Sequence, residues 1–334
     1  MTTPTFTSPL KGPLERFLQF KRAAGCRYRD EARALGCLDR FLGRYLAGKD
    51  PVITLEVVRA YVAEADGRSD KTRENRLVLI REFCRFLAIE DPRTAIPPRG
   101  FLKIPRRRYV QRILTREEGR RFLTACASFP RARCSPLRGV VHGTALTLLY
   151  VAGLRLGEAL RLTIGDVDLS GGLLHVHRTK FGKSRLVPIG PDMVWKLHEC
   201  GQVVEQRLGS RPGTARFFVG PTGRPISSTA LRASFRQVLA RAAIAPAGTG
   251  RRPRLHDLRG TFAVHRLLRW YEQDADLSAK LPLLVTYLGH VGLQSSQRYL
   301  QLAQDLLGEV TRRPEARFGH LITDEQEGSP PEIT

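Results

Sequence analysis

The sequence predicts a mainly α-helical protein with one small β-sheet, divided into two domains. Apolar residues recur at three- and four-residue steps along most of the 334-residue chain, which is the spacing of helices with one buried face. Residues 173–189 instead show the pattern of a β-hairpin, with two short apolar runs around a glycine-containing loop. A proline-rich stretch after residue 90 interrupts the helical pattern, and the length of the chain favours two domains.

We expect an N-terminal helical domain over residues 1–90, a linker over 91–113, a second domain over 114–320 and a disordered acidic tail over 321–334. The first domain contains four short amphipathic segments with arginine-rich outer faces. Their inward apolar positions are Leu14, Phe17 and Leu18; Leu35, Leu38, Phe41, Leu42 and Tyr45; Leu55, Val58, Tyr61 and Val62; and Leu77, Ile80, Phe83 and Phe86. This spacing predicts a small helical bundle with a basic surface.

The linker combines prolines with a run of positive charge. Its helix-breaking residues are Pro92, Pro97, Pro98 and Pro105, and Arg106, Arg107 and Arg108 follow them. Such a basic linker is suited to crossing a DNA groove. Thr115 and Glu118 then form a capping-box pattern, which predicts the first helix of the second domain.

Charge narrows the range of partners. Fifty-five Lys and Arg residues against 32 Asp and Glu residues give a net charge of +23, which points to a polyanion and first of all to nucleic acid. A surplus of charge for solubility is the alternative, although solubility rarely needs so large a charge of one sign. The arginines of the first domain fit a clamp on phosphates better than an ordinary solvated face.

Cysteine spacing and the lack of targeting patterns predict a soluble, cytoplasmic protein. The six cysteines are Cys26, Cys37, Cys84, Cys126, Cys134 and Cys200, with no CxxC pair and no Cys/His metal spacing, so we expect reduced thiols. The N-terminus lacks the basic start and apolar core of a signal peptide. No apolar run approaches the roughly 20 residues that span a bilayer, so no membrane partner is expected.

In the second domain, a helix is expected from Ser135 through the apolar run 146–151. Gly153 then allows a sharp turn, and Arg155 follows at the start of a short helix. The hairpin strands are expected at 173–177 and 185–189, with Lys180 and Lys183 in the loop between them. Further helices are predicted at 192–208 and 228–242.

The stretch from Leu255 to Tyr299 concentrates polar groups of a kind that can act on one phosphate. His256 and Arg259 stand at i and i+3, which places both on one face of a helix. The apolar run 281–288 ends at Gly289, a typical helix stop, with His290 directly after it and Tyr299 nine residues further on. Any one of these residues alone is more often a hydrogen-bonded core group than a functional one. Their combination favours a functional site.

Cleavage of a phosphodiester needs a nucleophile, positive charge on the non-bridging oxygens and a proton for the leaving oxygen. The sequence offers no strong carboxylate cluster for a metal, since Asp166 and Asp168 stand two apart in a predicted turn. It offers cations instead. Arg155 and Arg259 can grip one phosphate, His256 can accept the proton of a tyrosine, Lys180 can protonate a 5′-oxygen, and Tyr299 can attack phosphorus.

Four motifs in series carry a resemblance to a known family. AGLRLGEALRL, HRTKFGKSRLVPI, LHDLRGTFA and LGHVGLQSSQRYL resemble the tyrosine recombinase (phage integrase) family in order and spacing. The resemblance covers a mixed α+β catalytic domain from about Thr115 to Leu307, and it implies that the preceding bundle is a SAM-like core-binding domain. The roles that it implies are phosphate binding for Arg155, Arg259 and His290, general acid for Lys180, base for His256, nucleophile for Tyr299 and a supporting role for Glu158.

Some positions depart from the family's commonest pattern. Ala152 replaces a frequent threonine, Gly260 stands where a histidine often follows the second arginine, and Gln301 takes a place where histidine is common. None of these changes removes a catalytic group. In the hairpin loop, Lys183 is the rival of Lys180 as general acid, and the alignment of KFGKSR favours Lys180.

The resemblance implies a site-specific DNA recombinase that forms a covalent 3′-phosphotyrosine intermediate and needs neither metal nor ATP. It also implies a clamp of two domains on double-stranded DNA and a homotetramer, or a mixed recombinase tetramer, on two sites. A role in DNA integration or transposition for a mobile element is the favoured interpretation. A Xer-like resolvase of chromosome dimers, a type IB topoisomerase and a non-catalytic DNA-binding homologue are the alternatives.

Overall fold

The computed structural model describes residues 4–26, 28–105, 111–130, 135–177, 184–246, 252–289, 299 and 301. The chain divides into two compact units, Met1–Tyr109 and Val110–Thr334, and each forms its own set of contacts. The predicted fold class is confirmed, because the described part of the chain is mainly helical and contains a small antiparallel sheet. The bounds of the four predicted segments stay predictions.

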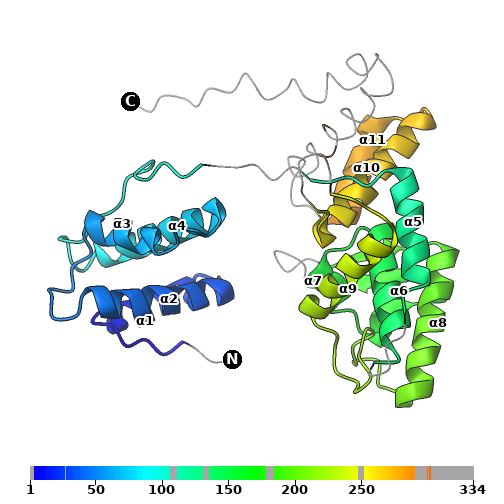
Figure 1. The fold of residues 1–334 in the computed structure, drawn as a ribbon, viewed down its shortest axis with the longest axis horizontal. Coiled ribbons are helices and arrows are strands. Elements are labelled where there is room, and N and C mark those ends of the chain that lie inside the picture. Colours follow the sequence, from blue (N-terminus) through cyan, green and yellow to red (C-terminus); the bar gives the residue numbers. More distant parts are fainter. Residues whose placement is uncertain are drawn as a thin grey trace. The chain divides into compact units, whose positions relative to one another are not determined.

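The first unit is a bundle of helices in the four places where apolar periodicity predicted them. These helices are α1 (Lys11–Ala23), α2 (Arg29–Tyr45), α3 (Leu55–Ala63) and α4 (Asp70–Leu87) (Figure 1). The side chains of Thr54 and Ser69 cap the first turns of α3 and α4. Phe17, Tyr61 and Phe83 are fully buried among the aliphatic residues of one core. Burial of these apolar faces is what holds the short helices together.

The chain after α4 runs along the first unit. The amide of Ala95 donates to the carbonyl of Ile53 over 2.8 Å. The guanidinium of Arg81 donates to the carbonyls of Pro97 and Pro98 over 2.9 and 3.0 Å. The early part of the predicted linker is therefore packed on the bundle, while its Arg106, Arg107 and Arg108 lie outside the described residues.

The second unit is built around one buried helix. Its helices are α5 (Arg116–Ala127), α6 (Arg138–Val151), α7 (Leu156–Ala159), the 3-10 turn η1 (Ile164–Asp166), α8 (Pro191–Leu208), α9 (Ser228–Arg241), α10 (Leu255–Glu272) and α11 (Leu277–Leu288). Within this group α6 packs against α5, α8, α9 and α10 (Figure 1). The burial of α6 agrees with this position, because every residue from Val141 to Leu149 is buried, whichever way its side chain points.

A small antiparallel sheet lies in the second unit. Its strands β1 (Val167–Asp168), β2 (Leu173–Val176) and β3 (Arg185–Pro188) pair in the order β1-β2-β3. Leu174 lies opposite Val187, and both are fully buried. The predicted hairpin is therefore confirmed in its strands, and its loop at 178–183 lies outside the described residues.

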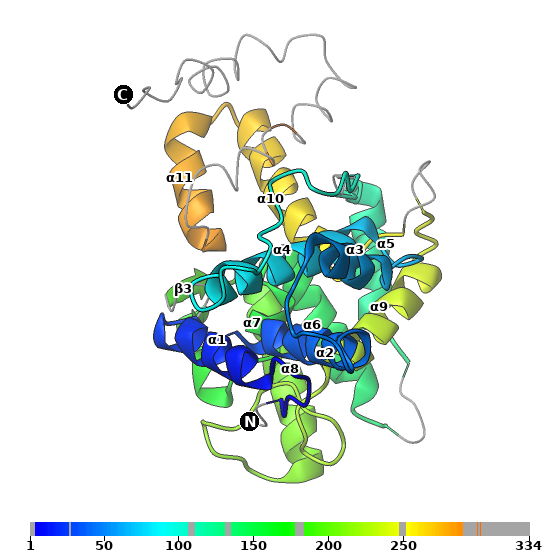
Figure 2. The same cartoon turned by 90° about the vertical axis from the view of Figure 1, so that its left-hand side faces the viewer.

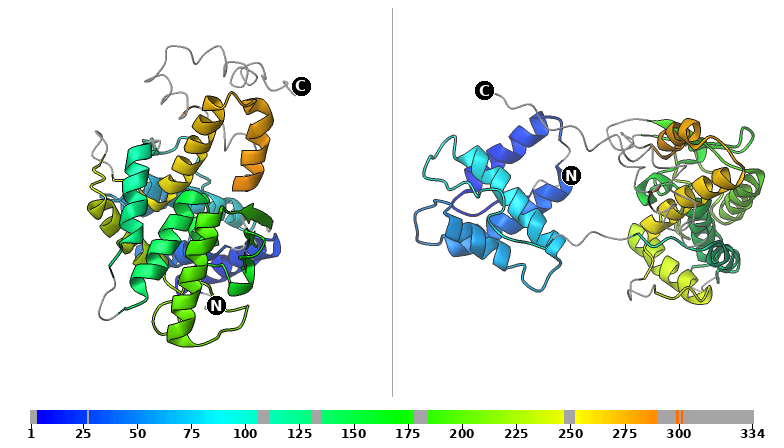
Figure 3. Two further views of the ribbon diagram at one scale, coloured as in Figure 1. Left: turned by 90° about the vertical axis from the view of Figure 1, so that its right-hand side faces the viewer. Right: turned by 90° about the horizontal axis from the view of Figure 1, so that it is seen from above.

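The last two long helices form an antiparallel pair, seen in Figure 2 and in the left view of Figure 3. α10 carries His256 and Arg259 in its first two turns, and α11 ends at Gly289, as the sequence predicted. The residues Phe262, Leu267, Leu284 and Leu288 lie in one apolar cluster between them. This packing brings the start of α10 and the end of α11 into the same region.

Two further expectations concern thiols and membranes. The cysteines that the structure describes as free are Cys26, Cys37, Cys84, Cys126 and Cys200, while Cys134 lies outside the described residues. Within the described part of the chain, no helix combines the length and the apolar character that crossing a bilayer requires.

Candidate active site

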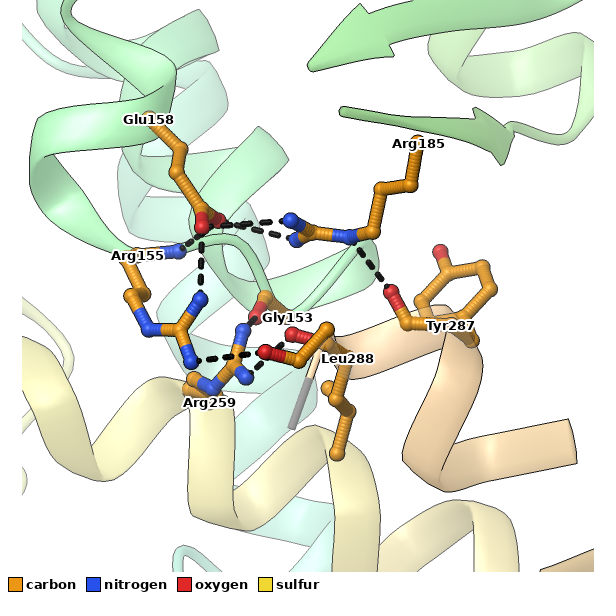
Figure 4. Close-up of polar contacts among 8 residues, drawn as sticks. Gly153, Arg155, Glu158, Arg185, Arg259, Tyr287 and Leu288 are labelled. Carbon is orange, nitrogen blue, oxygen red and sulfur yellow. Dashed lines mark hydrogen bonds and ion pairs between the residues drawn. The ribbon is translucent and has the colours of Figure 1, made fainter. Parts of the chain in front are cut away.

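Three arginines from different elements converge on the C-terminal end of α11 (Figure 4). Each donates a hydrogen bond to a different one of three successive carbonyls: Arg185 to Tyr287 over 2.8 Å, Arg259 to Leu288 over 2.5 Å and Arg155 to Gly289 over 3.1 Å. The last carbonyls of a helix lack partners within it and form the negative end of its dipole. They are therefore a natural place to collect guanidinium groups.

Arg155 is held by the turn that the sequence predicted. It is the N-cap residue of α7, and its amide donates to Glu158 Oε2 over 2.9 Å. One terminal nitrogen of its guanidinium donates to Glu158 Oε1 over 2.7 Å, and the other donates to the carbonyl of Gly289. The side chain remains 29% exposed, so its other N–H groups are within reach of a ligand.

Arg259 is almost completely buried, with 1% of its surface exposed. Its two terminal nitrogens donate to the carbonyls of Gly153 (2.8 Å) and Leu288. Burial, and after it the charge of Arg155, lower the pKa of Arg259, while Tyr299 and Glu158 act in the opposite direction; the net result is a pKa of about 10. The side chain therefore stays charged at neutral pH, as a buried cation fixed in a preorganised cradle.

The backbone at Gly153 requires glycine for two reasons. Its φ is +58°, a conformation that costs an ordinary L-residue energy. A Cβ atom here would also lie 2.5 Å from Cδ1 of Phe262 on α10. The turn between α6 and α7 thus packs directly against α10 and presents its carbonyl to Arg259.

Glu158 is the anion that organises these cations. Its side chain is 1% exposed and accepts hydrogen bonds from both Arg155 and Arg185. Burial alone would raise the pKa of Glu158, but the bonds from Arg185 and then from Arg155 outweigh this effect and lower the pKa to about 2. The carboxylate is therefore ionised throughout the physiological pH range.

Arg185 also belongs to this site, although no sequence motif predicted a role for it. Its guanidinium bonds to both oxygens of Glu158 over 3.2 and 2.9 Å, while its Nε bonds to the carbonyl of Tyr287. The strand pattern could have indicated this residue. Successive side chains of a strand point to opposite faces, and Val187 faces the core. By this alternation Arg185 also faces inward, and an inward charge needs a partner.

Tyr299 and His256 occupy different environments. Tyr299 is helical in conformation, 5% exposed, and lies in the apolar cluster that includes Phe262 and Leu288. Leu288 belongs to the same cluster, and its carbonyl accepts a hydrogen bond from Arg259. His256 stands in the first turn of α10 and is exposed, whereas Arg259 one turn later is buried. The helix face that was predicted to carry both His256 and Arg259 is therefore exposed to solvent at His256 and buried at Arg259.

Three predicted site residues lie outside the described residues. These are Lys180, its rival Lys183, and His290. The elements next to them are described, since β2 and β3 lead into the hairpin loop and Gly289 precedes His290. The roles assigned to all three stay predictions.

The two aspartates that the sequence offered as a weak metal signal serve local structure. Asp166 accepts from the amide of Thr163 over 2.8 Å and lies 3.0 Å from Nε2 of His177. Asp168 accepts from the amides of Ser170 and Gly171. Among the residues that the structure describes, no group of three or more His, Cys, Asp or Glu side chains could hold a metal ion.

Comparison with protein families and with curated proteins gives a consistent result. A family model described as "Phage integrase family" matches residues 112–305. The "Putative integrase/recombinase y4rB" of Sinorhizobium fredii (strain NBRC 101917 / NGR234) is 33% identical over 313 residues, covering 93% of this chain and 98% of that protein. The "Putative integrase/recombinase y4rE" of the same strain is 34% identical over 303 residues, covering 90% of this chain and 94% of that protein.

Solved structures share the fold at low sequence identity. The site-specific recombinase XerH bound to palindromic difH substrate matches with a TM-score of 0.64 and 16% identity, covering 93% of this chain and 98% of that one. A lambda integrase tetramer bound to a Holliday junction matches with a TM-score of 0.58 and 18% identity, covering 85% of this chain and 77% of that one. At such identities the likeness concerns the fold.

Proposed function

Because the chain belongs to the phage integrase family, we propose that it cuts and rejoins DNA strands through a covalent 3′-phosphotyrosine at Tyr299. Membership makes it a tyrosine-type enzyme of site-specific DNA recombination. The resemblance identified in its four sequence motifs is thereby confirmed. The finer proposal concerns which residues perform the chemistry and what the protein assembles on.

The observation that carries this proposal is the common anchoring of Arg155 and Arg259. Both guanidiniums are fixed by successive carbonyls at the end of α11, and Tyr299 lies in the apolar cluster that includes Leu288, whose carbonyl binds Arg259. Two fixed guanidiniums stabilise the extra negative charge of a pentavalent phosphate, because their donors are already oriented before the reaction. A guanidinium has five N–H groups, and Arg155, which is 29% exposed, keeps donors for a phosphate beyond the bonds to Glu158 and Gly289.

The chemistry balances without an external energy source. The phenol oxygen of Tyr299 forms a bond to phosphorus as the bond from phosphorus to the 5′-oxygen breaks. The phosphotyrosine ester conserves the phosphoester linkage, so a 5′-hydroxyl can reverse the step and rejoin a strand. Attack needs a base for the phenol proton, and departure needs an acid for the 5′-oxygen.

We assign the base to His256 and the acid to Lys180, with His290 as a further donor to the phosphate. The exposure of His256 at the N-terminus of α10 supports its role, since a helix start favours a bound anion and a DNA phosphate approaches from solvent. The role of Lys180 as the acid is supported by its place in the sequence between β2 and β3. Arg185 on β3 binds Glu158, so this hairpin is joined to the site.

Double-stranded DNA is the proposed partner, and four protomers are the proposed assembly. A net charge of +23 supports binding to the phosphate backbone. The XerH and lambda integrase structures were solved with DNA, the latter as a tetramer on a Holliday junction. The curated relatives named integrase/recombinase support a role in DNA integration rather than in resolving chromosome dimers.

The test begins by finding the site. Selection from random duplexes with the Tyr299→Phe variant, which binds without cutting, gives the preferred sequence. A duplex of that sequence with a nick a few nucleotides 3′ of the scissile phosphate then traps cleaved enzyme, because the short fragment that carries the released 5′-hydroxyl diffuses away. We expect a denaturant-resistant adduct with the wild type and none with Tyr299→Phe.

The outcomes separate the proposal from its rivals. Absence of an adduct despite sequence-specific binding would contradict the proposal and indicate a DNA-binding regulator. Relaxation of supercoiled plasmids that lack the selected sequence would instead indicate a type IB topoisomerase. An adduct at another residue, located by mass spectrometry of the digested complex, would exclude Tyr299 as the nucleophile.

A further inference from the structure

A short extended segment, residues 111–114, lies against α10 and leads from the interdomain chain into α5. Leu114 bonds α10 twice, because its amide donates to Oγ1 of Thr261 (3.1 Å) and its carbonyl lies 2.8 Å from Nε2 of His265. Gln111 bonds one turn earlier, where its Nε2 donates to the carbonyl of His256 over 3.1 Å. The segment therefore follows α10 from its first turn to its third.

Gln111 is a buried amide, 6% exposed, in a place that only a glycine on α10 leaves open. A Cβ atom at Gly260 would lie 2.3 Å from Nε2 of Gln111 and 2.4 Å from its Cδ. In an α-helix the carbonyl of residue 256 accepts from the amide of residue 260, so a second donor to that carbonyl must pass the side chain of 260. Glycine at 260 removes that obstacle.

We propose that Gln111 is a positioning residue for His256, and that Gly260 is present to admit it. This inference rests on the proposed role of His256 in cleavage. The first turn of a helix is the part that opens most easily, because its amides have no partner within the helix. A hydrogen bond to the carbonyl of His256 holds that turn closed and fixes where the imidazole stands relative to Arg259.

The same contact accounts for a departure from the family's usual pattern. Gly260 occupies the position where a histidine often follows the second arginine. Here the space beside α10 is filled by an amide from the preceding chain segment instead of by a side chain of the helix. The geometry of His256 therefore depends on residue 111, which is 145 residues away in the chain.

Gln111→Met tests the hydrogen bond alone, because methionine has a similar length and no donor. We expect single-turnover cleavage of the nicked duplex to be about five- to tenfold slower, the scale of one hydrogen bond. The dissociation constant for the duplex should stay within about twofold of wild type, since phosphate contacts dominate affinity. Gln206→Met, on the exposed side of α8, is the matched control and should cleave at the wild-type rate.

Compensation between positions 111 and 260 supplies a second test. Gly260→Ala should slow cleavage more than Gln111→Ala does, since its methyl group displaces Gln111. Combined with Gln111→Ala, the same Gly260→Ala change should cost little more than Gln111→Ala alone, because the clash is gone. If the rate reductions of Gly260→Ala and Gln111→Ala simply multiply in the double variant, the proposal is overturned. A Gln111→Met enzyme that cleaves at the wild-type rate would overturn it too.

One readout does not require cleavage at all. Amide hydrogen exchange at Gly260, whose N–H faces the carbonyl of His256, should be faster in Gln111→Met by about the same factor as cleavage is slower. If wild type forms no adduct, the proposed function fails while this exchange still tests the contact. Unchanged exchange at Gly260 would overturn the positioning role whether or not the enzyme cuts DNA.

Discussion

Arg185 on β3 and Glu158 on α7 share two hydrogen bonds, of 3.2 and 2.9 Å, at the centre of the site. Glu158 also holds Arg155, and Arg185 also holds the carbonyl of Tyr287. One ion pair thus connects the β-hairpin, Arg155 and the end of α11 (Figure 4). Disturbing it should affect both stability and catalysis.

Replacing Arg185 with methionine should destabilise the protein by about 3 kcal/mol, because a buried carboxylate loses its main partner. The measurement is the urea midpoint at neutral pH. Arg236→Met, on the exposed face of α9, is the control. It should change the free energy of unfolding by less than about 0.5 kcal/mol. Equal shifts in the two variants would show that the ion pair contributes nothing to folding.

The low pKa of Glu158 predicts a pH dependence of stability. Its pKa falls from 4.5 to about 2 in the folded protein, so its contribution is complete above about pH 4.5 and is lost as the pH falls toward 2. The stability difference between wild type and Glu158→Gln should therefore narrow by about 3 kcal/mol or less over that range. Urea titrations at several pH values test this, with Glu117→Gln, at an exposed carboxylate, as the control. A difference that stays constant with pH would contradict the prediction.

Gly153→Ala should cost more than a positive φ alone explains. Gly223 has a φ of +74° and open space within 4 Å of where a methyl carbon would lie, whereas a methyl at Gly153 would meet Phe262 at 2.5 Å. We expect Gly223→Ala to cost about 1 kcal/mol and Gly153→Ala about 2–4 kcal/mol. Thermal unfolding of both variants compares them. Similar losses would mean that the turn adjusts freely against α10.

Arg155→Lys should separate charge from geometry. The guanidinium reaches Glu158 and the carbonyl of Gly289 with two nitrogens, and an ammonium group has only one. We expect cleavage to be about 100-fold slower or more, with binding of duplex DNA nearly unchanged. Single-turnover cleavage and a binding isotherm measure the two effects, and Arg161→Lys on the exposed side of the neighbouring turn serves as the control. Wild-type cleavage by Arg155→Lys would show that positive charge alone suffices.

Much of the fold followed from local sequence, because local rules act within a few residues. Periodic apolar spacing predicted α1 to α4, and a capping box at Thr115 and Glu118 is present in the structure as predicted. Gly289 ends α11, and the strands of the hairpin pair in the expected antiparallel way. The family was identified from four motifs and is confirmed by the comparisons.

The order of residues along the chain already specifies which chemical groups are available: two arginines, a tyrosine, and histidine and lysine candidates at recognisable positions. Three-dimensional packing is needed to establish how these groups are held. The pairing of Arg185 with Glu158 joins residues 27 positions apart, and the bond from Gln111 to His256 spans 145. Contacts of this kind leave no periodic signal, because they depend on which helices pack together. Packing of α10 against α11 likewise buries Arg259 and lowers its pKa, which no local pattern encodes.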